Sequence, residues 1–273
     1  MTVGMNVDPN NPCAAPPAER LLQSGFHGVR LTARANDVNR KYIDDMLAAG
    51  LQVVAVVGTG DNSGFIPPQK QVILQIYNEP DTANGSTFIP SVAYACLYAA
   101  WRAKCDGYTC WTAGFVSGDP DYYRQFLNAL WNLYEGLTLP GVVVPNAPNL
   151  KNVLRFPEAV AIHPYLMNPV RLKSLAQACW NIGVEVTGAG IPVVATEWFQ
   201  QANQNPANDP IAPFQAALNN PDPDGVCTTW NSFFGWCSNM SDLPGAVVSP
   251  DGTCLLEGRR LIDAIGGDAG WCP

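Results

Sequence analysis

The fold is decided by one stretch of sequence, Gln75-Ile76-Tyr77-Asn78-Glu79-Pro80-Asp81, which ends an apolar run that begins at Val72. A second stretch of the same kind, Ile191-Pro192-Val193-Val194-Ala195-Thr196-Glu197-Trp198, lies far downstream. Each stretch is typical of a buried parallel strand that carries one carboxylate at its end. Parallel α/β barrels place their reactive groups at the carboxyl ends of the strands. We therefore expect Glu79 and Glu197 to face each other across one pocket.

Apolar runs alternate with helical patterns along the chain, which is typical of repeated βα units. We expect strands at Val3–Val7, Gly28–Thr32, Val53–Val57, Val72–Tyr77, Thr109–Phe115, Ala159–His163, Val193–Glu197 and Ser232–Trp236. We expect helices at Ala18–Ser24, Asp37–Ala49, Pro90–Lys104, Pro120–Glu135, Pro169–Ile182, Pro213–Asn219 and Leu255–Ile265. Between Gly60 and Gln71 the sequence is rich in turn residues and predicts no helix. Eight strands close a parallel barrel, so the predicted fold is an α/β (β/α)8 TIM barrel, reduced because its third crossover helix is missing or vestigial.

Length and charge narrow the class of protein. With 273 residues, 47% of them hydrophobic and only 14% charged, the chain suits a single (β/α)8 catalytic domain over residues 1–273. The formal charge of −8 disfavours nucleic acid and anionic membranes as partners, and a neutral polymer suits it better. We expect a monomer. The first residues, Met1–Val7, resemble a strand and not a signal peptide, and secretion is favoured if a signal peptide was removed.

The nine cysteines divide by their surroundings. Those in loops rich in Pro, Gly and Asp are expected to form disulfides, and these are Cys13, Cys227, Cys254 and Cys272. Those in apolar surroundings are expected to behave as small hydrophobic residues, and these are Cys96, Cys105, Cys110, Cys179 and Cys237. There is no Cys-x-x-Cys pair, and His27 and His163 are the only histidines. The sequence therefore predicts no structural zinc site.

The predicted strand ends carry a set of polar and aromatic residues. Arg30 closes the second predicted strand. Asn78-Glu79-Pro80 lies at the end of the fourth, His163-Pro164-Tyr165 of the sixth, Thr196-Glu197 of the seventh and Trp236 of the eighth. This order resembles the retaining glycoside hydrolases of clan A, which are (β/α)8 barrels. Families five and thirty-nine are the nearest in motif wording, and the Asn-Glu-Pro-Asp run resembles the small β-1,3-glucanases of family one hundred and twenty-eight.

The resemblance implies a role for each matching position. Glu79 would be the acid/base and Glu197 the nucleophile, since such enzymes use one carboxyl of each kind. Asn78 would hydrogen-bond the sugar 2-hydroxyl, and Arg30 would lie near Glu197 and keep it ionised. The implied activity is endo-acting cleavage of a β-linked glucan, mannan or xylan through a covalent glycosyl-enzyme, and this mechanism implies no metal or organic cofactor.

Further positions complete the implied substrate site. Tyr165 would donate a hydrogen bond to the nucleophile, and His163 would lie near the acid/base. Trp236 would form the floor of the subsite before the cleaved bond, because sugar rings stack on aromatic planes. Trp198, beside the second glutamate, is a further candidate for an aromatic wall of the cleft.

Each of these site residues also has a simpler, structural interpretation. A glutamate at a strand end also caps helices or pairs with an arginine, Arg30 also suits a structural ion pair, and His163 also suits a buried core imidazole. The aromatic residues suit core packing equally well. An alternative function is a catalytically inactive carbohydrate-binding or structural barrel, including a viral particle component; the intact pair of glutamates argues against it. An unrelated barrel enzyme is disfavoured, because no glycine cluster for phosphate follows the late strands and histidines are too few for a metal centre.

Overall fold

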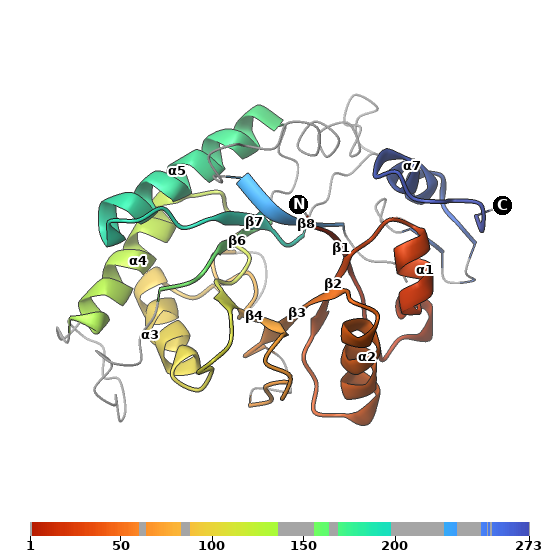
Figure 1. Ribbon diagram of the computed structural model, residues 1–273. Helices are drawn as coiled ribbons and strands as arrows, with labels where there is room; N and C mark the ends of the chain where they lie inside the picture. The colour runs from red at the N-terminus through yellow and green to blue at the C-terminus, as the bar shows by residue number, and fades with distance from the viewer. Residues whose placement is uncertain are drawn as a thin grey trace.

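The structure is a computed structural model that describes residues 2–59, 64–82, 88–135, 156–163, 169–197, 227–233, 247–249, 251 and 253–272. It contains one eight-stranded parallel sheet with helices packed around it (Figure 1). The strands are β1 (Thr2–Asn6), β2 (Gly28–Thr32), β3 (Gln52–Val57), β4 (Ile73–Ile76), β5 (Cys110–Trp111), β6 (Val160–Ile162), β7 (Val193–Ala195) and β8 (Cys227–Phe233).

The strand order is that of a parallel barrel. It runs β5-β4-β3-β2-β1-β8-β7-β6, so β1 pairs with both β2 and β8. The two strands at the ends of this order also meet, through isolated parallel bridges from Trp111 to Ala159 and from Phe115 to Ile162. Backbone hydrogen bonds support these bridges, such as Thr112 N–H to the Ala159 carbonyl at 3.1 Å. The predicted (β/α)8 barrel is confirmed.

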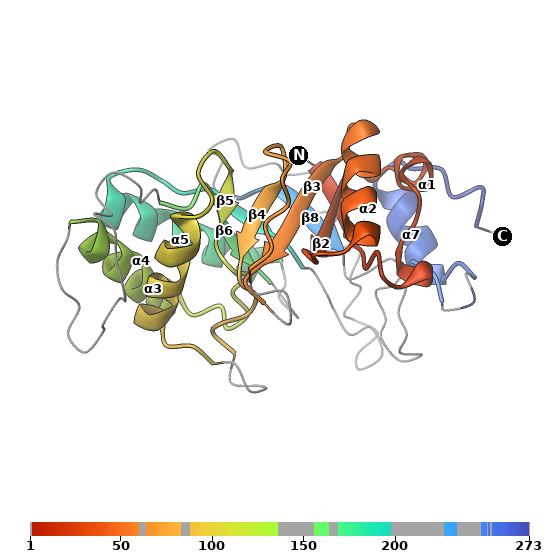
Figure 2. The same ribbon diagram turned by 90° about the horizontal axis from the view of Figure 1, so that it is seen from below.

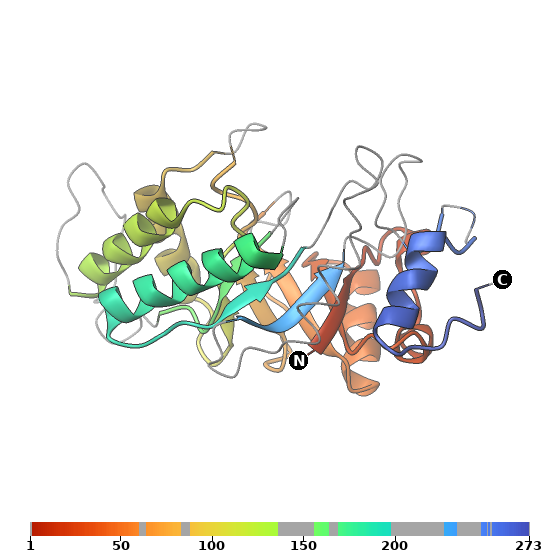
Figure 3. The same cartoon turned by 90° about the horizontal axis from the view of Figure 1, so that it is seen from above.

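The helices cover the outside of the strands. They are α1 (Ala18–Gln23), α2 (Asp37–Ala48), α3 (Ser91–Arg102), α4 (Pro120–Tyr134), α5 (Pro169–Thr187) and α7 (Leu256–Ala264), with the short 3-10 helix η1 at Pro12–Ala14. Figures 2 and 3 show the strands between α3, α4 and α5 on one side and α1, α2 and α7 on the other. None of the helices within the described ranges is long and apolar enough to cross a membrane.

Local sequence explains where the helices begin and end. Asn36 caps α2 by accepting a hydrogen bond from the Asn39 N–H, and Asp119 precedes Pro120 at the first turn of α4. The helix expected to stop at Ile182 continues through Gly183 to Thr187. Gly183 lies against the segment before β7, where an added Cβ would be 3.0 Å from the Ile191 nitrogen. The glycine is thus a close-packing position and not a helix end.

The crossover between β3 and β4 is reduced. Its described residues, 58–59 and 64–72, contain no helix, as the turn-rich sequence predicts. The expected helix at Pro213–Asn219 lies outside the described residues.

The eighth strand corrects one expectation. The sequence predicts it at Ser232–Trp236, whereas the described strand spans Cys227–Phe233; residues 234–236 lie outside the described ranges. Pairing fixes its position, because Thr2 to Met5 of β1 lie opposite Trp230 to Phe233. Cys227, which was expected in a loop, lies opposite Val193 of β7, so the strand starts there.

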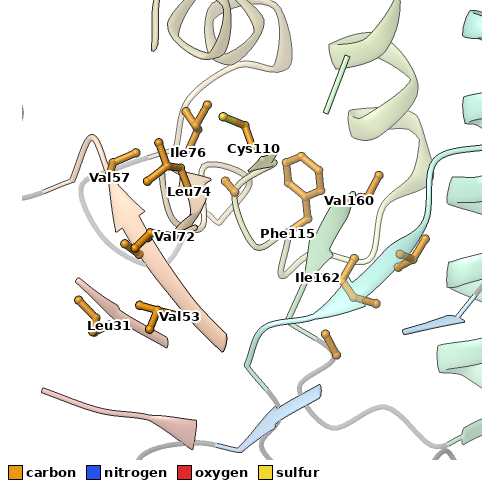
Figure 4. Packing of buried hydrophobic residues seen from close by; sticks show 14 of the residues in the cluster. Leu31, Val53, Val57, Val72, Leu74, Ile76, Cys110, Phe115, Val160 and Ile162 are labelled. Carbon is orange, nitrogen blue, oxygen red and sulfur yellow. The ribbon is translucent and has the colours of Figure 1, made fainter. Parts of the chain in front are cut away.

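Buried apolar residues form two layers. Alternate residues of β1 to β7 face the helices, for example Val53, Ala55 and Val57 of β3, and Figure 4 shows part of this outer layer. The residues between them form a separate inner cluster of Val54, Ile73, Trp111, Ala159, Ala161 and Val194. Because strand side chains alternate between faces, this cluster fills the barrel interior.

The cysteines follow the prediction in part. Cys254 and Cys272 form a disulfide that ties the segment before α7 to the end of the chain, and Cys13 is also disulfide-bonded. Cys96, Cys105, Cys110 and Cys179 are free thiols, as expected from their apolar surroundings.

Candidate functional site

The strand alternation that fills the barrel also builds the site. Gln75 lies two residues after Ile73, His163 two after Ala161 and Thr196 two after Val194, so all three continue the inward-facing positions of the inner cluster. Arg30 pairs in register with Val54 on one side and with Asn6 on the other. Above its apolar interior, the barrel thus carries a polar layer.

Arg30 is the centre of that layer. Its guanidinium donates to Glu197 Oε1 at 2.6 Å and to Asn6 Oδ1 at 2.9 Å through Nη1. It also donates to Gln75 Oε1 at 2.7 Å through Nε and to Asn78 Oδ1 at 2.7 Å through Nη2. One buried cation therefore ties β1, β4 and β7 together at their carboxyl ends. Arg30 itself lies in the middle of β2, and not at its end as the sequence suggested.

The two glutamates lie close together but in unlike surroundings. A carboxylate oxygen of Glu79 and one of Glu197 are within 4.8 Å of each other. The Glu197 side chain is 12% exposed and is bonded to the Arg30 cation, whereas that of Glu79 is 30% exposed. Glu79 Oε1 lies 2.8 Å from His163 Nδ1. Glu197 is thus held by a cation, whereas Glu79 is held by an imidazole and is more exposed to solvent.

His163 connects these two carboxylates. Its side chain is fully buried, and its Nε2 lies 3.1 Å from Thr196 Oγ1 and 3.6 Å from Glu197 Oε1. Gly114 makes room for it, since an added Cβ there would be 1.9 Å from His163 Nε2. The position of the imidazole thus depends on a glycine three residues after the end of β5, in Thr112-Ala113-Gly114.

The backbone around Glu79 is in an uncommon conformation. Tyr77 has φ of 75° and Glu79 has φ of 46°, both in the left-handed region that non-glycine residues seldom adopt. Neighbouring groups hold this turn: the Tyr77 N–H donates to the Val57 carbonyl at 2.8 Å, and Asp81 accepts from the backbone and hydroxyl of Ser117. Strain of this kind costs about 1–3 kcal/mol per residue and clusters at functional sites.

A pocket opens beside these groups. It has a volume of about 310 Å³ and is lined by Arg30, Thr32, Val56, Thr59, Tyr77, Asn78, Glu79 and Glu197. These residues come from β2, β3, β4 and β7 or from the segments that follow them. Asn78 already accepts hydrogen bonds through Oδ1 from Arg30 and Gln75, so its amide nitrogen is the group positioned to donate.

Three side chains of the site could in principle bind a metal ion. Glu79, His163 and Glu197 offer three ligand atoms within 4.8 Å of one another. However, Arg30 already occupies Glu197 Oε1, and the two His163 nitrogens face different glutamates. An ion would have to compete with the guanidinium, so the arrangement fits a metal poorly.

The structure brings together five of the residues singled out from the sequence, namely Arg30, Asn78, Glu79, His163 and Glu197. Tyr165, Trp198 and Trp236 lie outside the described residues. Sequence reasoning missed Asn6 and Gln75, which both bond to Arg30, and it gave no role to Thr196. The signal that would have found them is a polar residue at an inward position of an apolar strand.

Comparisons with known proteins support the fold. No protein-family model and no curated protein matches the sequence. Among solved structures, a psychrophilic glycoside hydrolase family 10 endo-β-1,4-xylanase is similar with a TM-score of 0.55 and 9% identity, over 96% of each chain. A family 128 (subgroup III) curdlan-specific exo-β-1,3-glucanase from Blastomyces gilchristii is similar with a TM-score of 0.50 and 13% identity, over 97% of each chain. The chain thus has the barrel fold found in clan A glycoside hydrolases, and the resemblance drawn from the strand-end motifs is confirmed at that level.

Proposed function

We propose that this chain is a retaining glycoside hydrolase that cleaves β-linked glucan, mannan or xylan, with Glu79 as acid/base and Glu197 as nucleophile. The observation that carries the proposal is the approach of the two carboxylates to within 4.8 Å at the mouth of the barrel. Retaining enzymes hold their carboxyls about 5–5.5 Å apart, whereas inverting enzymes need about 6.5–9.5 Å to admit a water.

The surroundings of the two glutamates support the division of roles. A nucleophile must attack as the carboxylate, and the Arg30 cation at 2.6 Å favours that form of Glu197. The acid/base must give a proton to the leaving oxygen and later take one from water. Glu79 is the more exposed of the two glutamates and lines the pocket, where the leaving group and the water would be. His163 at 2.8 Å orients Glu79 for these transfers.

The reaction follows in two steps. In the first, Glu197 Oε attacks the anomeric carbon while Glu79 protonates the departing glycosidic oxygen, and a glycosyl ester of Glu197 forms. In the second, Glu79 removes a proton from water, which attacks the same carbon and frees Glu197 with the original configuration retained. The Asn78 amide nitrogen is placed to donate to the sugar 2-hydroxyl, a contact that strengthens as the ring flattens.

The substrate class rests on the pocket and on the proteins of similar fold. The wall of Thr32, Thr59 and Tyr77 offers hydroxyls and one aromatic ring to a neutral sugar. The two similar structures named above are an endo-β-1,4-xylanase and a curdlan-specific exo-β-1,3-glucanase. These observations support a β-linked polysaccharide as the substrate, and we propose cleavage inside the chain, as the resemblance of the strand-end motifs implies.

A rate assay with matched variants tests the proposal. The protein is assayed on β-glucans, mannan, xylan and aryl β-glycosides with good leaving groups. Glu197→Ala should lose activity on all of them by about 10⁴-fold or more, since no ester can form. Glu79→Ala should lose about 10²–10⁴-fold on polysaccharide but keep the first step on activated aryl glycosides, and azide should restore its turnover. Glu185→Ala, an exposed glutamate on α5, is the control and should leave the rates unchanged.

Two further measurements separate the proposal from its alternatives. A 2-deoxy-2-fluoro aryl glycoside should label Glu197, as mapped by peptide mass spectrometry, and proton NMR should show the β-anomer as first product. Activity that survives both glutamate changes would overturn the assignment. Binding of polysaccharide with no hydrolysis of any substrate would instead identify an inactive carbohydrate-binding barrel.

A further inference from the structure

A second pocket lies on the carboxyl face of the barrel, between the segments that follow β4 and β5. It has a volume of about 260 Å³ and opens where helices α3 and α4 begin, two helices that lie side by side (Figures 1 and 2). Asp81 joins its two walls, because its carboxylate accepts from the Val116 N–H at 3.0 Å and from the Ser117 N–H at 2.8 Å. We call it the rim pocket, and its lining includes Asp81, Phe88, Ser91, Asp119, Tyr122 and Gln125.

Phe88 gives the rim pocket an aromatic platform that is anchored beside Glu79. Pro80 follows Glu79 directly, and its carbonyl accepts a hydrogen bond from the Ile89 N–H at 2.8 Å. The Phe88 side chain is 55% exposed, and its ring packs edge-on against Tyr122 with the centroids 6.4 Å apart. The Tyr122 hydroxyl donates to the Ile89 carbonyl at 2.7 Å. The exposed ring is therefore held in place next to the segment that carries the acid/base.

The polar groups of the rim pocket are arranged to bind hydroxyls. Ser91 Oγ donates to Gln125 Oε1 at 2.9 Å and occupies the amide oxygen, so Gln125 Nε2 is the group that can donate to a ligand. Asp119 Oδ1 accepts from the Asp121 N–H at 2.9 Å, and its carboxylate has further capacity to accept. A flat apolar ring beside a donor and an acceptor suits a neutral sugar, which has apolar ring faces and hydroxyl groups at its edges.

The rim pocket and the pocket lined by Glu79 and Glu197, here called the reaction pocket, meet at β4. The reaction pocket is lined by Glu197 and by residues of β2 to β4 and the segments after them, whereas the rim pocket lies beyond β4 at β5. In the proposed reaction the attacked sugar lies at Glu197, and Glu79 protonates the oxygen that leaves. The leaving part of the chain therefore begins at Glu79 and extends away from Glu197, toward the rim pocket.

We propose that the rim pocket binds a neutral sugar residue in the leaving part of the polysaccharide, with Phe88 as the stacking platform and Asp119 and Gln125 as the hydrogen-bonding groups. This inference rests on the proposed function, because it takes Glu79 as the acid/base. Binding on both sides of the cleaved bond uses contacts with distant sugars to hold that bond in position for reaction. It also gives cleavage inside a chain a physical basis, since only a chain that continues past the bond fills both pockets.

Two substrates with different leaving groups test the proposal. One is a short β-linked oligosaccharide, whose leaving group is a sugar, and the other is the β-glycosyl fluoride of the same sugar, whose leaving group is a single atom that cannot reach the rim pocket. Phe88→Ala should lower kcat/KM about tenfold on the oligosaccharide, because the stacking contact is lost, and should leave the fluoride rate unchanged. Turnover of the fluoride still needs Glu79 as the base of the second step, so an unchanged kcat shows that Glu79 is undisturbed.

Further variants separate the platform from a general effect on the loop. Phe88→Tyr keeps the ring and should keep the oligosaccharide rate. Gln125→Glu keeps the acceptor for Ser91 but removes the N–H donors, so it should lower the oligosaccharide rate about threefold to tenfold and leave the fluoride rate unchanged. Val38→Ala changes an equally exposed apolar side chain on α2 and is the control, with both rates unchanged.

The outcomes distinguish this inference from the proposed function. Hydrolysis of neither substrate by the unchanged protein would refute the proposed function and this inference with it. If the unchanged protein hydrolyses both, equal losses on the two substrates in Phe88→Ala, or no loss on either, would overturn the rim pocket alone. A loss confined to long polysaccharide, with the oligosaccharide rate unchanged, would identify a separate anchoring surface for the polymer and would overturn the assignment to the leaving part.

Discussion

Two arginine–glutamate ion pairs lie at opposite ends of the barrel and differ in what surrounds them. Arg30 binds Glu197 at 2.6 Å, and Arg102 binds Glu158 at 2.5 Å. The arginine side chains are almost equally buried, at 7% and 3% exposure. Distance and burial alone give no reason to rank one above the other.

Their other partners separate them. Arg102 donates to the Tyr108 carbonyl, and Glu158 Oε2 accepts from the Cys110 N–H, so this pair binds backbone at the amino ends of β5 and β6. Arg30 instead donates to the side chains of Asn6, Gln75, Asn78 and Glu197, and it lines a pocket. An ion pair that binds backbone holds a loop, whereas one that binds side chains around a pocket orients reactive groups. This matches the division of a barrel into a reactive carboxyl face and a stabilising amino face.

The largest effect is expected when Arg30 is removed. Arg30→Met should lower kcat/KM by about 10³-fold, equivalent to about 4 kcal/mol, because Glu197 loses the cation that favours its charged form and Asn78 loses a donor. Arg30→Lys should give an intermediate rate, since an ammonium group keeps the charge but cannot make all the hydrogen bonds of the planar guanidinium. Initial rates on the best substrate measure this. A loss below tenfold with a large fall in Tm would place Arg30 in the same structural class as Arg102.

Arg102 should show the reverse pattern. Arg102→Met removes the cation from Glu158, which still accepts from the Cys110 N–H, and removes a donor from the Tyr108 carbonyl. We expect a loss of about 2–3 kcal/mol in the free energy of unfolding, below the usual range for a buried pair because Glu158 is 37% exposed. The folded variant should keep its kcat. Urea unfolding measures the free energy of unfolding, and initial rates divided by the active-site concentration from titration measure kcat. Arg124→Met breaks an exposed pair with Glu185 and is the control, with an expected change within about 0.5 kcal/mol.

Gly114 tests whether the imidazole between the glutamates needs its position. Gly114→Ala places a methyl group where His163 Nε2 lies, so the ring must turn away from Glu79 or the backbone must shift. We expect kcat to fall about 30-fold, equivalent to about 2 kcal/mol, and stability to fall by about 1–3 kcal/mol. In a His163→Ala background the same change should cost little stability, because the clash is gone. An equal loss of stability in both backgrounds would show that the methyl group meets something other than His163.

The sequence predicted the barrel and much of its site because both follow from strong local patterns. Apolar runs that each end in a polar motif placed Glu79 and Glu197 at the carboxyl ends of β4 and β7. The eighth strand was misplaced because its bounds depend on pairing with β1, which no local pattern reports. The partners of Arg30 were incomplete for a related reason, since Asn6 and Gln75 are joined to it only when distant strands come into register. The left-handed turn at Tyr77 and Glu79 could not be predicted, because neither position is the glycine that usually marks such a conformation.

Gln75 offers the finest test of the carboxyl-face network, because it touches Arg30 and Asn78 but neither glutamate in the contacts described. It is fully buried, accepts from Arg30 Nε at 2.7 Å and donates to Asn78 Oδ1 at 3.3 Å and to the Tyr77 carbonyl at 3.2 Å. Gln75→Leu should lower kcat about tenfold, equivalent to about 1.4 kcal/mol, with little change in KM, because the guanidinium loses one of its restraints.

A double-mutant cycle decides whether Gln75 acts through Arg30. If it does, Gln75→Leu should have almost no further effect on kcat in the Arg30→Met background, since the group that it positions is absent. Fully additive losses would mean that Gln75 supports the Tyr77–Glu79 turn independently, through its bond to the Tyr77 carbonyl. Circular dichroism and Tm of each variant separate this from unfolding, because a positioning residue changes kcat in protein that remains folded. The cycle thus resolves the site into a network centred on one arginine or two supports that act side by side.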